Sequence, residues 1–313
     1  MNLKDLAQQP EKITSGHRLC AGCAEPIIAK LVLASIKDPV VVINATGCLE
    51  VATTIYPYTA WKIPWMHNAF ENAPATVSGI IEAYNVILRK KPSARPKWAR
   101  NLPRNIKFAV FSGDGGSYDI GLQSLSGALE RGHKFLYVCY DNEAYMNTGN
   151  QRSGATPLGS STTTSPAGKV KQGKEEWRKD LTAIVEGHHI NYVAQASIFH
   201  WADLSKKVQR AMEVNGPSFI NVMSPCQRSW GFDPSQTVQI AKLAVETNFW
   251  PLYEINNGKF TLNYEPRKRT PIIEWIKSQK RFKHLLKPEN KKIIERIQKH
   301  IDKQFETLRK RQG

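Results

Sequence analysis

A short glycine-rich segment carries an acidic residue at a position suited to binding a magnesium ion. Asp114 lies in the sequence SGDGG, after an apolar run at residues 106–112 that is typical of a buried strand. Asn142 follows the next apolar run, 28 residues later. Mg²⁺ prefers oxygen ligands, takes few of them from protein and shares the rest with phosphate and water. The side-chain oxygens of Asp114 and Asn142 are therefore predicted to hold Mg²⁺ on a diphosphate. The glycines beside Asp114 would let the backbone approach the phosphates.

The alternative for this segment is a plain turn between a strand and a helix. A lone Gly-Asp-Gly sequence favours that alternative, because so short a motif matches by chance. Here the motif is followed by helical spacing, a second apolar run and then an asparagine. This succession favours the diphosphate site, with residues 113–116 against the phosphates.

The cysteines form a second group, with the residue type and spacing of a metal site. Cys20 and Cys23 make a CxxC pair, Cys48 follows after 24 residues and Cys226 after a further 177. Four thiolates suit either Zn²⁺ or an iron–sulfur cluster, and a CxxC pair also suits a redox dithiol. A compact zinc site usually has two close pairs, whereas only one pair is close here. The fifth cysteine, Cys139, lies inside the apolar run KFLYVCY and is predicted to be a core residue.

Alternating strand and helix patterns supply the frame for both groups. They predict an α/β domain with a mostly parallel sheet and helices on both faces. Ligands of such sheets gather beyond the carboxyl ends of the strands. Cys48, residues 113–116, residues 141–148 and Cys226 all follow predicted strands, so they are expected at that edge. The predicted strands are 39–44, 106–112, 134–140, 192–195 and 218–223, and the predicted helices are 24–37, 69–88, 118–131, 177–186 and 202–214.

The net charge of +17 is concentrated near the end of the sequence. Residues 266–313 hold sixteen Lys or Arg and five Asp or Glu. Such a segment fits an acidic partner or solvent as well as nucleic acid, and nucleic acid is the least favoured of these. We therefore divide the chain into a domain at 1–250 and a basic, mainly helical extension at 251–313. An amphipathic helix in this extension is indicated by Ile293, Ile297, Ile301, Phe305 and Leu308.

Other features of the sequence bear on the cellular location of the protein and on the state of its cysteines. No stretch approaches the roughly 20 consecutive apolar residues that span a bilayer, and the N-terminal sequence lacks the apolar run of a secretory signal. Five cysteines in 313 residues without a signal argue against a disulfide framework. We expect a cytoplasmic protein with no membrane partner, whose thiols are free to bind metal. Residues 148–174, rich in Gly, Ser and Thr, are expected to form a long functional loop.

The spacing between the Gly-Asp-Gly segment and Asn142 resembles the thiamine diphosphate motif. Together with the cysteines, it makes the chain similar to the β subunits of pyruvate:ferredoxin oxidoreductases, within the 2-oxoacid:ferredoxin oxidoreductase family. The similarity runs from about residue 16 to residue 231 and is carried by GHRLCAGCAEP, ATGCLEVATTIYPYTAWKIPWMHNAFENAPAT, FSGDGGSYDIG and YDNEAYMNTGNQRSGATP. It implies the thiamine-diphosphate-binding fold.

The resemblance also implies three cofactors and the residues that hold them. Mg²⁺ is bound by the side chains of Asp114 and Asn142 and by the carbonyl oxygen of Ala144. Asn147 is the implied catalytic residue, because a neutral amide donor near the substrate stabilises charge on the oxoacid; a loop-capping role is its alternative. A 4Fe–4S cluster is held by Cys20, Cys23, Cys48 and Cys226. The implied thiamine diphosphate site comprises Thr46, Gly47, Cys48, Leu49, Glu50, Gly113, Asp114, Gly115, Gly116, Asn142, Ala144, Tyr145, Met146, Asn147 and Thr148.

The implied reaction is the reversible oxidative decarboxylation of a 2-oxoacid. Pyruvate, coenzyme A and oxidised ferredoxin give acetyl-CoA, CO₂ and reduced ferredoxin. The implied partners are an α subunit, which carries the carboxylate that activates the aminopyrimidine, and γ, δ or ferredoxin-like subunits. Enzymes for 2-oxoisovalerate, 2-oxoglutarate and oxalate share this plan and remain alternatives. The competing hypotheses are a thiamine diphosphate decarboxylase without a cluster and a zinc protein that binds nucleic acid through the basic segment.

Overall fold

The computed structural model describes residues 3–312 and is built around an eight-stranded sheet with the order β2-β1-β3-β4-β6-β5-β7-β8. From β2 to β5 in this order neighbouring strands are parallel, whereas β7 pairs antiparallel with both β5 and β8. The predicted α/β fold with a mostly parallel sheet is therefore confirmed. The strands are β1 (Val40–Ala45), β2 (Trp65–Asn68), β3 (Lys107–Gly113), β4 (Leu136–Asp141), β5 (Tyr192–Ser197), β6 (Ser218–Met223), β7 (Tyr253–Asn256) and β8 (Lys259–Leu262).

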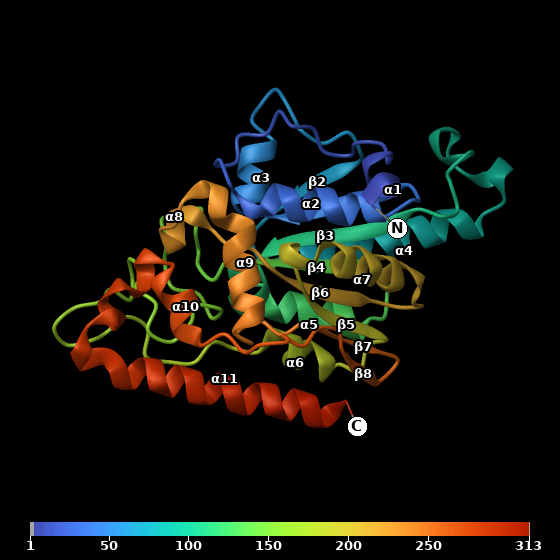
Figure 1. Ribbon diagram of the computed structural model, residues 1–313. Coiled ribbons are helices and arrows are strands. Elements are labelled where there is room, and N and C mark those ends of the chain that lie inside the picture. The colour runs from blue at the N-terminus through green and yellow to red at the C-terminus, as the bar shows by residue number, and fades with distance from the viewer. Residues whose placement is uncertain (1–2, 313) are drawn as a thin grey trace.

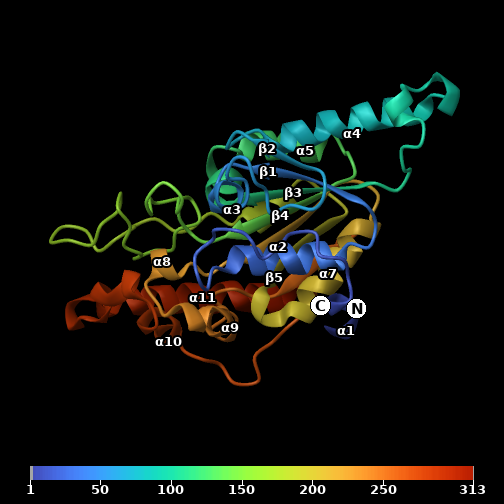
Figure 2. The same cartoon turned by 90° about the horizontal axis from the view of Figure 1, so that it is seen from above.

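Helices cover both faces of this sheet (Figure 1, Figure 2). On one face α2 (Ala24–Ser35) packs against α7 (Trp201–Glu213), and on the other α4 (Ala73–Arg89) packs against α5 (Leu122–Glu130). The short helix α6 (Leu181–Glu186) joins the second face. Each helix buries a stripe of apolar residues against the strands, so the two faces form separate cores.

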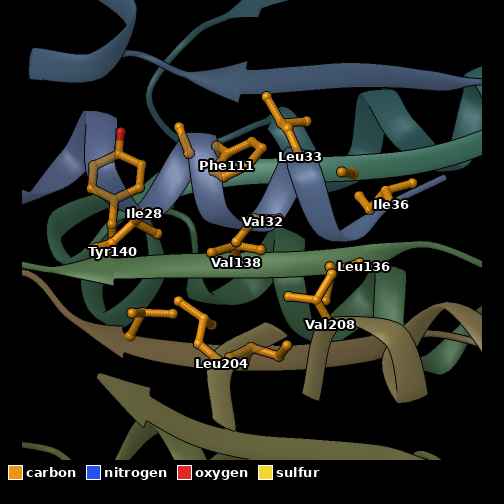
Figure 3. Packing of buried hydrophobic residues seen from close by; sticks show 14 of the residues in the cluster. Ile28, Val32, Leu33, Ile36, Phe111, Leu136, Val138, Tyr140, Leu204 and Val208 are labelled. Atoms are coloured by element: carbon orange, nitrogen blue, oxygen red, sulfur yellow. The ribbon is translucent and has the colours of Figure 1, made fainter. Parts of the chain in front are cut away.

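The side chains of strand β4 alternate between the two cores. Leu136, Val138 and Tyr140 belong to the core beneath α2 and α7, whereas Tyr137 and Cys139 belong to the core beneath α4 and α5. This alternation follows from the two-residue period of a strand. Figure 3 shows Leu136 and Val138 between the apolar side chains of α2 and α7. The thiol of Cys139 is completely buried in the opposite core, in agreement with its predicted role.

A third apolar core lies among the helices that follow β6. These elements are α8 (Gln227–Trp230), α9 (Thr237–Glu246), α10 (Ile272–Lys277), the 3₁₀ segment η6 (Lys280–Leu286) and α11 (Lys291–Arg311). Trp230, Trp250 and Trp275 are fully buried in this core. Helix α11 contributes Ile297 and Ile301, so it packs on the body of the protein, along which it runs in Figure 1. Neither α11 nor any other helix within residues 3–312 is long and apolar enough to cross a membrane.

The hairpin of β7 and β8 continues the sheet past residue 250, the boundary that the sequence predicted. Val193 of β5 pairs with Ile255 of β7, and Tyr253 and Ile255 lie in the core beneath α4 and α5. The mainly helical part of the chain therefore begins after the hairpin. The division into two domains stays a prediction.

Some predicted helices have different bounds in the structure. The helix expected at 177–186 begins at Leu181, because the side chain of Asp180 accepts a hydrogen bond from the backbone N–H of Ala183 at 3.0 Å and caps its start. The helix expected at 118–131 is preceded by a π-helical turn, Gly115–Asp119, and begins at Leu122. Residues 148–174 contain no helix or strand, as predicted. Elements that the sequence did not predict include α1 (Leu3–Ala7), α3 (Cys48–Thr53), β2, α8, α9, β7 and β8.

Candidate cofactor site and metal centre

The loops that carry the predicted ligands leave strands that are neighbours in the sheet. Strands β1, β3, β4 and β6 are adjacent in this order and parallel, so their carboxyl ends meet at one edge. Cys48 follows β1, Asp114 follows β3, Asn142 follows β4 and Cys226 follows β6. The topology thus gathers segments that are far apart in the sequence at one edge of the sheet.

A cavity of about 150 Å³ opens at this edge. Leu49, Glu50 and Gly116 are the predicted thiamine diphosphate residues that do not line it. Larger cavities, of about 410 and 430 Å³, lie under α11 and at the amino ends of the strands, and neither includes a predicted ligand. The residues that line the smaller cavity are Glu25, Thr46, Gly47, Cys48, Phe70, Gly113, Asp114, Gly115, Tyr140, Asn142, Ala144, Tyr145, Met146, Asn147 and Thr148.

Asp114 is a buried carboxylate without a cationic partner among residues 3–312. Its side chain is 1% exposed and accepts a hydrogen bond from the hydroxyl of Ser153 at 2.5 Å. Burial raises the pKa of Asp114, and the nearby charge of Asp141 raises it further. Asn142 follows the neighbouring strand and lines the same cavity. A buried carboxylate and an amide oxygen beside a cavity fit a divalent cation, because the ion offsets the buried negative charge.

Glu25 is a functional candidate that the sequence analysis missed. It lies in the first turn of α2, where glutamate is ordinary, so the sequence carries no signal for it. In the structure it is 4% exposed and lines the cavity. One carboxylate oxygen accepts a hydrogen bond from the side chain of Asn142 at 3.2 Å, and the other has no partner within the described residues. Burial raises the pKa of Glu25 to about 7, so this carboxyl group exchanges a proton near neutral pH.

Replacing Glu25 by glutamine is expected to change how stability depends on pH. The ordinary pKa of 4.5 rises to about 7 in the folded chain, so the folded state binds the additional proton between these values. The stability that the wild-type carboxyl contributes is therefore complete below pH 4.5 and is lost as the pH rises through about 7. The pKa shift corresponds to a change of about 3 kcal/mol in the free energy of unfolding of wild type. Urea unfolding of wild type and Glu25→Gln at about pH 5 and about pH 8 measures this change. If the free energy of unfolding had the same pH dependence in both proteins, that would contradict the burial of an ionisable Glu25.

The predicted cluster ligands influence one another electrostatically. Cys23, Cys48 and Cys226 are half-buried and Cys20 is exposed. Burial raises the pKa of Cys226 to about 11 and raises the pKa of Cys23 and Cys48 well above the ordinary value, and the charge of Glu25 adds to each rise. Cys20 and Cys226 also raise the pKa of Cys48, as near neighbours do. Such thiols ionise readily only when a metal supplies positive charge, so the donor set fits a metal centre.

The cysteines are not arranged around a single ion. Within residues 3–312, no group of three or more His, Cys, Asp or Glu side chains has the geometry to hold one metal ion. A structural zinc ion needs four ligands that converge on it at about 2.0–2.3 Å. In an iron–sulfur cluster the cysteines bind different iron atoms and need not converge on one point. Within the described residues, the four thiols therefore do not form a preformed tetrahedral site for a zinc ion.

The CxxC loop is held against the segment that carries Cys226. The side chain of Gln227 donates a hydrogen bond to the carbonyl of Ala21 at 2.8 Å, and the hydroxyl of Thr237 donates to the carbonyl of Gly22 at 2.5 Å. Gly22 has a φ of +72°, and a Cβ there would lie 2.2 Å from the carbonyl oxygen of Pro234. Because only glycine allows this approach, Gly22 is what lets the two cysteine-bearing segments meet.

Beside the cavity, buried charged side chains form a balanced network. Asp141 accepts hydrogen bonds from Arg178 and from the hydroxyl of Tyr118, both at 2.6 Å. Glu143 accepts hydrogen bonds from Arg178 at 3.0 Å and from Arg281 at 2.5 Å. Both carboxylates are completely buried, and the two guanidinium groups balance their charge, as burial of charge requires. The sequence analysis missed this network because its members come from four separate segments.

The remaining predicted residues differ in their access to the cavity. Asn147 is exposed at the rim, and its side chain makes no hydrogen bond within the described residues, so its amide is free to donate to a ligand. Glu50 instead turns away, where it accepts a hydrogen bond from Thr54 at 3.1 Å and lies 3.7 Å from His67. Leu49 is part of the core beneath α2.

Comparisons with known proteins show which proteins this chain is similar to. Residues 45–222 match the family described as thiamine pyrophosphate enzyme, C-terminal TPP binding domain. The pyruvate synthase subunit PorB of Thermotoga maritima is 50% identical over 98% of this chain and 95% of its own length. The ketoisovalerate oxidoreductase subunit VorB of Pyrococcus abyssi is 38% identical over 96% of this chain and 93% of its own length. The solved 2-oxoglutarate:ferredoxin oxidoreductase from Magnetococcus marinus shares the fold, with a TM-score of 0.55 and 20% identity over 74% of this chain and 79% of that chain.

Proposed function

This chain belongs to the family of the pyruvate synthase subunit PorB, and we propose that it is the β subunit of a pyruvate:ferredoxin oxidoreductase. The proposed complex converts pyruvate, coenzyme A and oxidised ferredoxin to acetyl-CoA, CO₂ and reduced ferredoxin. The observation that carries the proposal is the cavity after β1, β3 and β4, which Cys48, Asp114 and Asn142 line together. The lining of this cavity thus includes a candidate cluster ligand as well as the candidate Mg²⁺ ligands.

Thiamine diphosphate with Mg²⁺ is the cofactor assigned to this cavity. When bound, it supplies the carbon nucleophile for the oxoacid and the electron sink for decarboxylation. The side chains of Asp114 and Asn142 and the carbonyl of Ala144 are the residues that hold the ion in this proposal. The hydroxyl of Tyr140 and one oxygen of Glu25 are buried without partners among the described residues, so they are available to the cofactor. Asn147, free at the rim, stabilises charge on the oxoacid.

A 4Fe–4S cluster is the metal centre assigned to Cys20, Cys23, Cys48 and Cys226. Support for this assignment comes from the electrostatic interactions among the thiols, which place them near one another. Cys48 lines the cofactor cavity, so a cluster bound through it is adjacent to the cofactor. This adjacency suits transfer of single electrons from the cofactor toward ferredoxin.

Partner subunits complete the site in this proposal. The cavity of about 150 Å³ is smaller than the roughly 300–1,000 Å³ of most ligand sites, and it is lined mainly by residues assigned to the diphosphate and the metal. We assign the carboxylate that activates the aminopyrimidine to an α subunit. Ferredoxin-like, γ or δ subunits carry the electrons onward. The cytoplasmic location stays an expectation from the sequence.

Assays of the co-purified complex against a panel of 2-oxoacids test the proposal. Identity of 50% with a pyruvate synthase subunit, against 38% with a ketoisovalerate oxidoreductase subunit, favours pyruvate. We expect ferredoxin reduction that depends on coenzyme A and is fastest with pyruvate. A preference for 2-oxoisovalerate, 2-oxoglutarate or oxalate would replace the substrate but keep the enzyme class. Decarboxylation without ferredoxin reduction would instead favour the decarboxylase, and a colourless zinc-containing chain that binds DNA would refute the proposal.

A further inference from the structure

One side chain from the helices at the end of the chain contacts the turn after β4, beside the candidate cofactor site. Arg281, in η6, is only 2% exposed, although it belongs to the basic segment for which the sequence suggested a partner or solvent. Its Nη2 donates a hydrogen bond to Glu143 at 2.5 Å, and its Nε donates to Gln279 at 2.8 Å. The guanidinium lies over the ring of Trp230, 4.0 Å from its centroid. These contacts hold a buried cation in one defined position.

Glu143, the partner of Arg281, stands between Asn142 and Ala144. It is completely buried, and its φ of +66° lies in the left-handed region that is uncommon for a glutamate. This conformation sets the direction in which the chain passes from one proposed Mg²⁺ ligand to the next. It is held by hydrogen bonds from two guanidinium groups to the carboxylate and from the hydroxyl of Thr156 to the carbonyl oxygen at 2.6 Å.

The other guanidinium cannot take over the role of Arg281. Arg178 already donates to Asp141 at 2.6 Å and to Glu143 at 3.0 Å. Without Arg281, one guanidinium would face two buried carboxylates, and negative charge would remain beside the proposed Mg²⁺ ligands. Removing one member of a buried charged pair leaves the other uncompensated, so the turn would rearrange.

The same guanidinium also contacts the segment that carries Cys226. Trp230, on which it stacks, donates its indole N–H to the backbone carbonyl of Asn142 at 2.9 Å. The backbone N–H of Trp230 donates to the carbonyl of Cys226 at 2.8 Å. Arg281 therefore contacts the Asn142 turn through Glu143 and the Cys226 segment through Trp230.

We propose that Arg281 is a positioning residue that holds residues 142–144 in their Mg²⁺-binding conformation and joins this turn to the Cys226 segment. The inference rests on the proposed thiamine diphosphate site and extends it. It gives the basic segment at the end of the chain an indirect part in cofactor binding, through Glu143, in addition to any role that its exposed cations have.

Substitution of Arg281 by methionine tests this role in the complex co-purified with its partner subunits. Arg281→Met keeps an unbranched side chain but removes the charge and the donors. We expect the Kd for thiamine diphosphate with Mg²⁺, measured by calorimetry, to rise about 10- to 100-fold, as for other residues that support a metal ligand. Arg296→Met is the matched control, because the exposed Arg296 stacks on Trp177 at 5.1 Å in the same segment. It should bind as tightly as wild type.

Substitution of Glu143 distinguishes positioning from a general loss of structure. In a Glu143→Gln/Arg281→Met chain the buried charge is balanced again, so we expect tighter thiamine diphosphate binding than in Arg281→Met alone. Weaker binding by the double variant, or an unchanged Kd in Arg281→Met, overturns the positioning role. If wild type itself does not bind thiamine diphosphate with Mg²⁺, the proposed function fails and the inference fails with it.

A milder variant keeps the test decisive if Arg281→Met does not fold. Arg281→Lys retains the charge but loses the planar stack on Trp230. We expect its amides at residues 142–147 to exchange hydrogen faster than those of wild type in the cofactor-free chain, with unchanged exchange in β4. Equal exchange at residues 142–147 in both proteins contradicts the inference.

Discussion

Asp114→Ala is expected to abolish Mg²⁺-dependent binding of thiamine diphosphate, with a loss of affinity of at least about 100-fold. Mg²⁺ takes few ligands from protein, so the loss of a carboxylate cannot be made up by the remaining two. Asp114→Asn should lose nearly as much, because it keeps the shape of the side chain but not the charge. Calorimetric titration of the complex with thiamine diphosphate, with and without Mg²⁺, measures both losses.

The same substitutions should leave the cofactor-free fold and the cluster intact. Burial raises the pKa of Asp114, and the hydroxyl of Ser153 is its hydrogen-bond partner, so its carboxyl group contributes little to stability. We expect Asp114→Asn to keep or raise the free energy of unfolding, by up to about 2 kcal/mol, as is common for residues whose placement serves function. The visible absorption of the cluster should not change. Loss of the cluster together with the cofactor would mean that the two sites are not separable.

Cys48→Ala is expected to remove the 4Fe–4S cluster and with it the reduction of ferredoxin. Such a cluster is held by four thiolates, and the three cysteines that remain come from loops that Cys48 does not share. Iron analysis and low-temperature EPR of the reduced complex, purified without oxygen, measure the loss. Cys139→Ala is the matched control, because that thiol is completely buried in the core beneath α4 and α5. It should keep the iron and lose only stability, by about 1 kcal/mol.

Two results would contradict this assignment of the cysteines. Full iron content in Cys48→Ala would remove that residue from the ligand set. Stoichiometric zinc and no iron in wild type would replace the cluster by a zinc centre. Cys48 lines the cavity, but thiamine diphosphate should still bind to Cys48→Ala when Mg²⁺ is present, since the proposed Mg²⁺ ligands come from other strands.

The part of the fold that could be predicted from the sequence is the part with a strong local pattern. Residues 106–112 and 134–140 are mainly apolar because both faces of β3 and β4 are covered. The two motifs follow directly at their ends, so their meeting at one edge could be expected. Strands β2 and β8 lie at the edges of the sheet and are only partly buried, so they carry no such pattern.

Side chains that enter the site from distant segments could not be predicted. Glu25 follows a CxxC pair at the start of a helix, and only the packing of α2 against the sheet buries it beside Asn142. Arg281 is one of sixteen Lys or Arg residues after position 265, and a count of charge does not tell which of them turns inward. In both cases the deciding information is a contact between segments more than a hundred residues apart.

The contact between Glu143 and Arg281 also bears on how the protein is made. The central strands β1, β3, β4 and β6 all leave the ribosome before Arg281 does, and folding during synthesis begins with the segments that emerge first. Until Arg281 arrives, the turn after β4 has only one of its two guanidinium partners. We therefore expect the cofactor to bind only once Arg281 has been synthesised and has packed against Glu143.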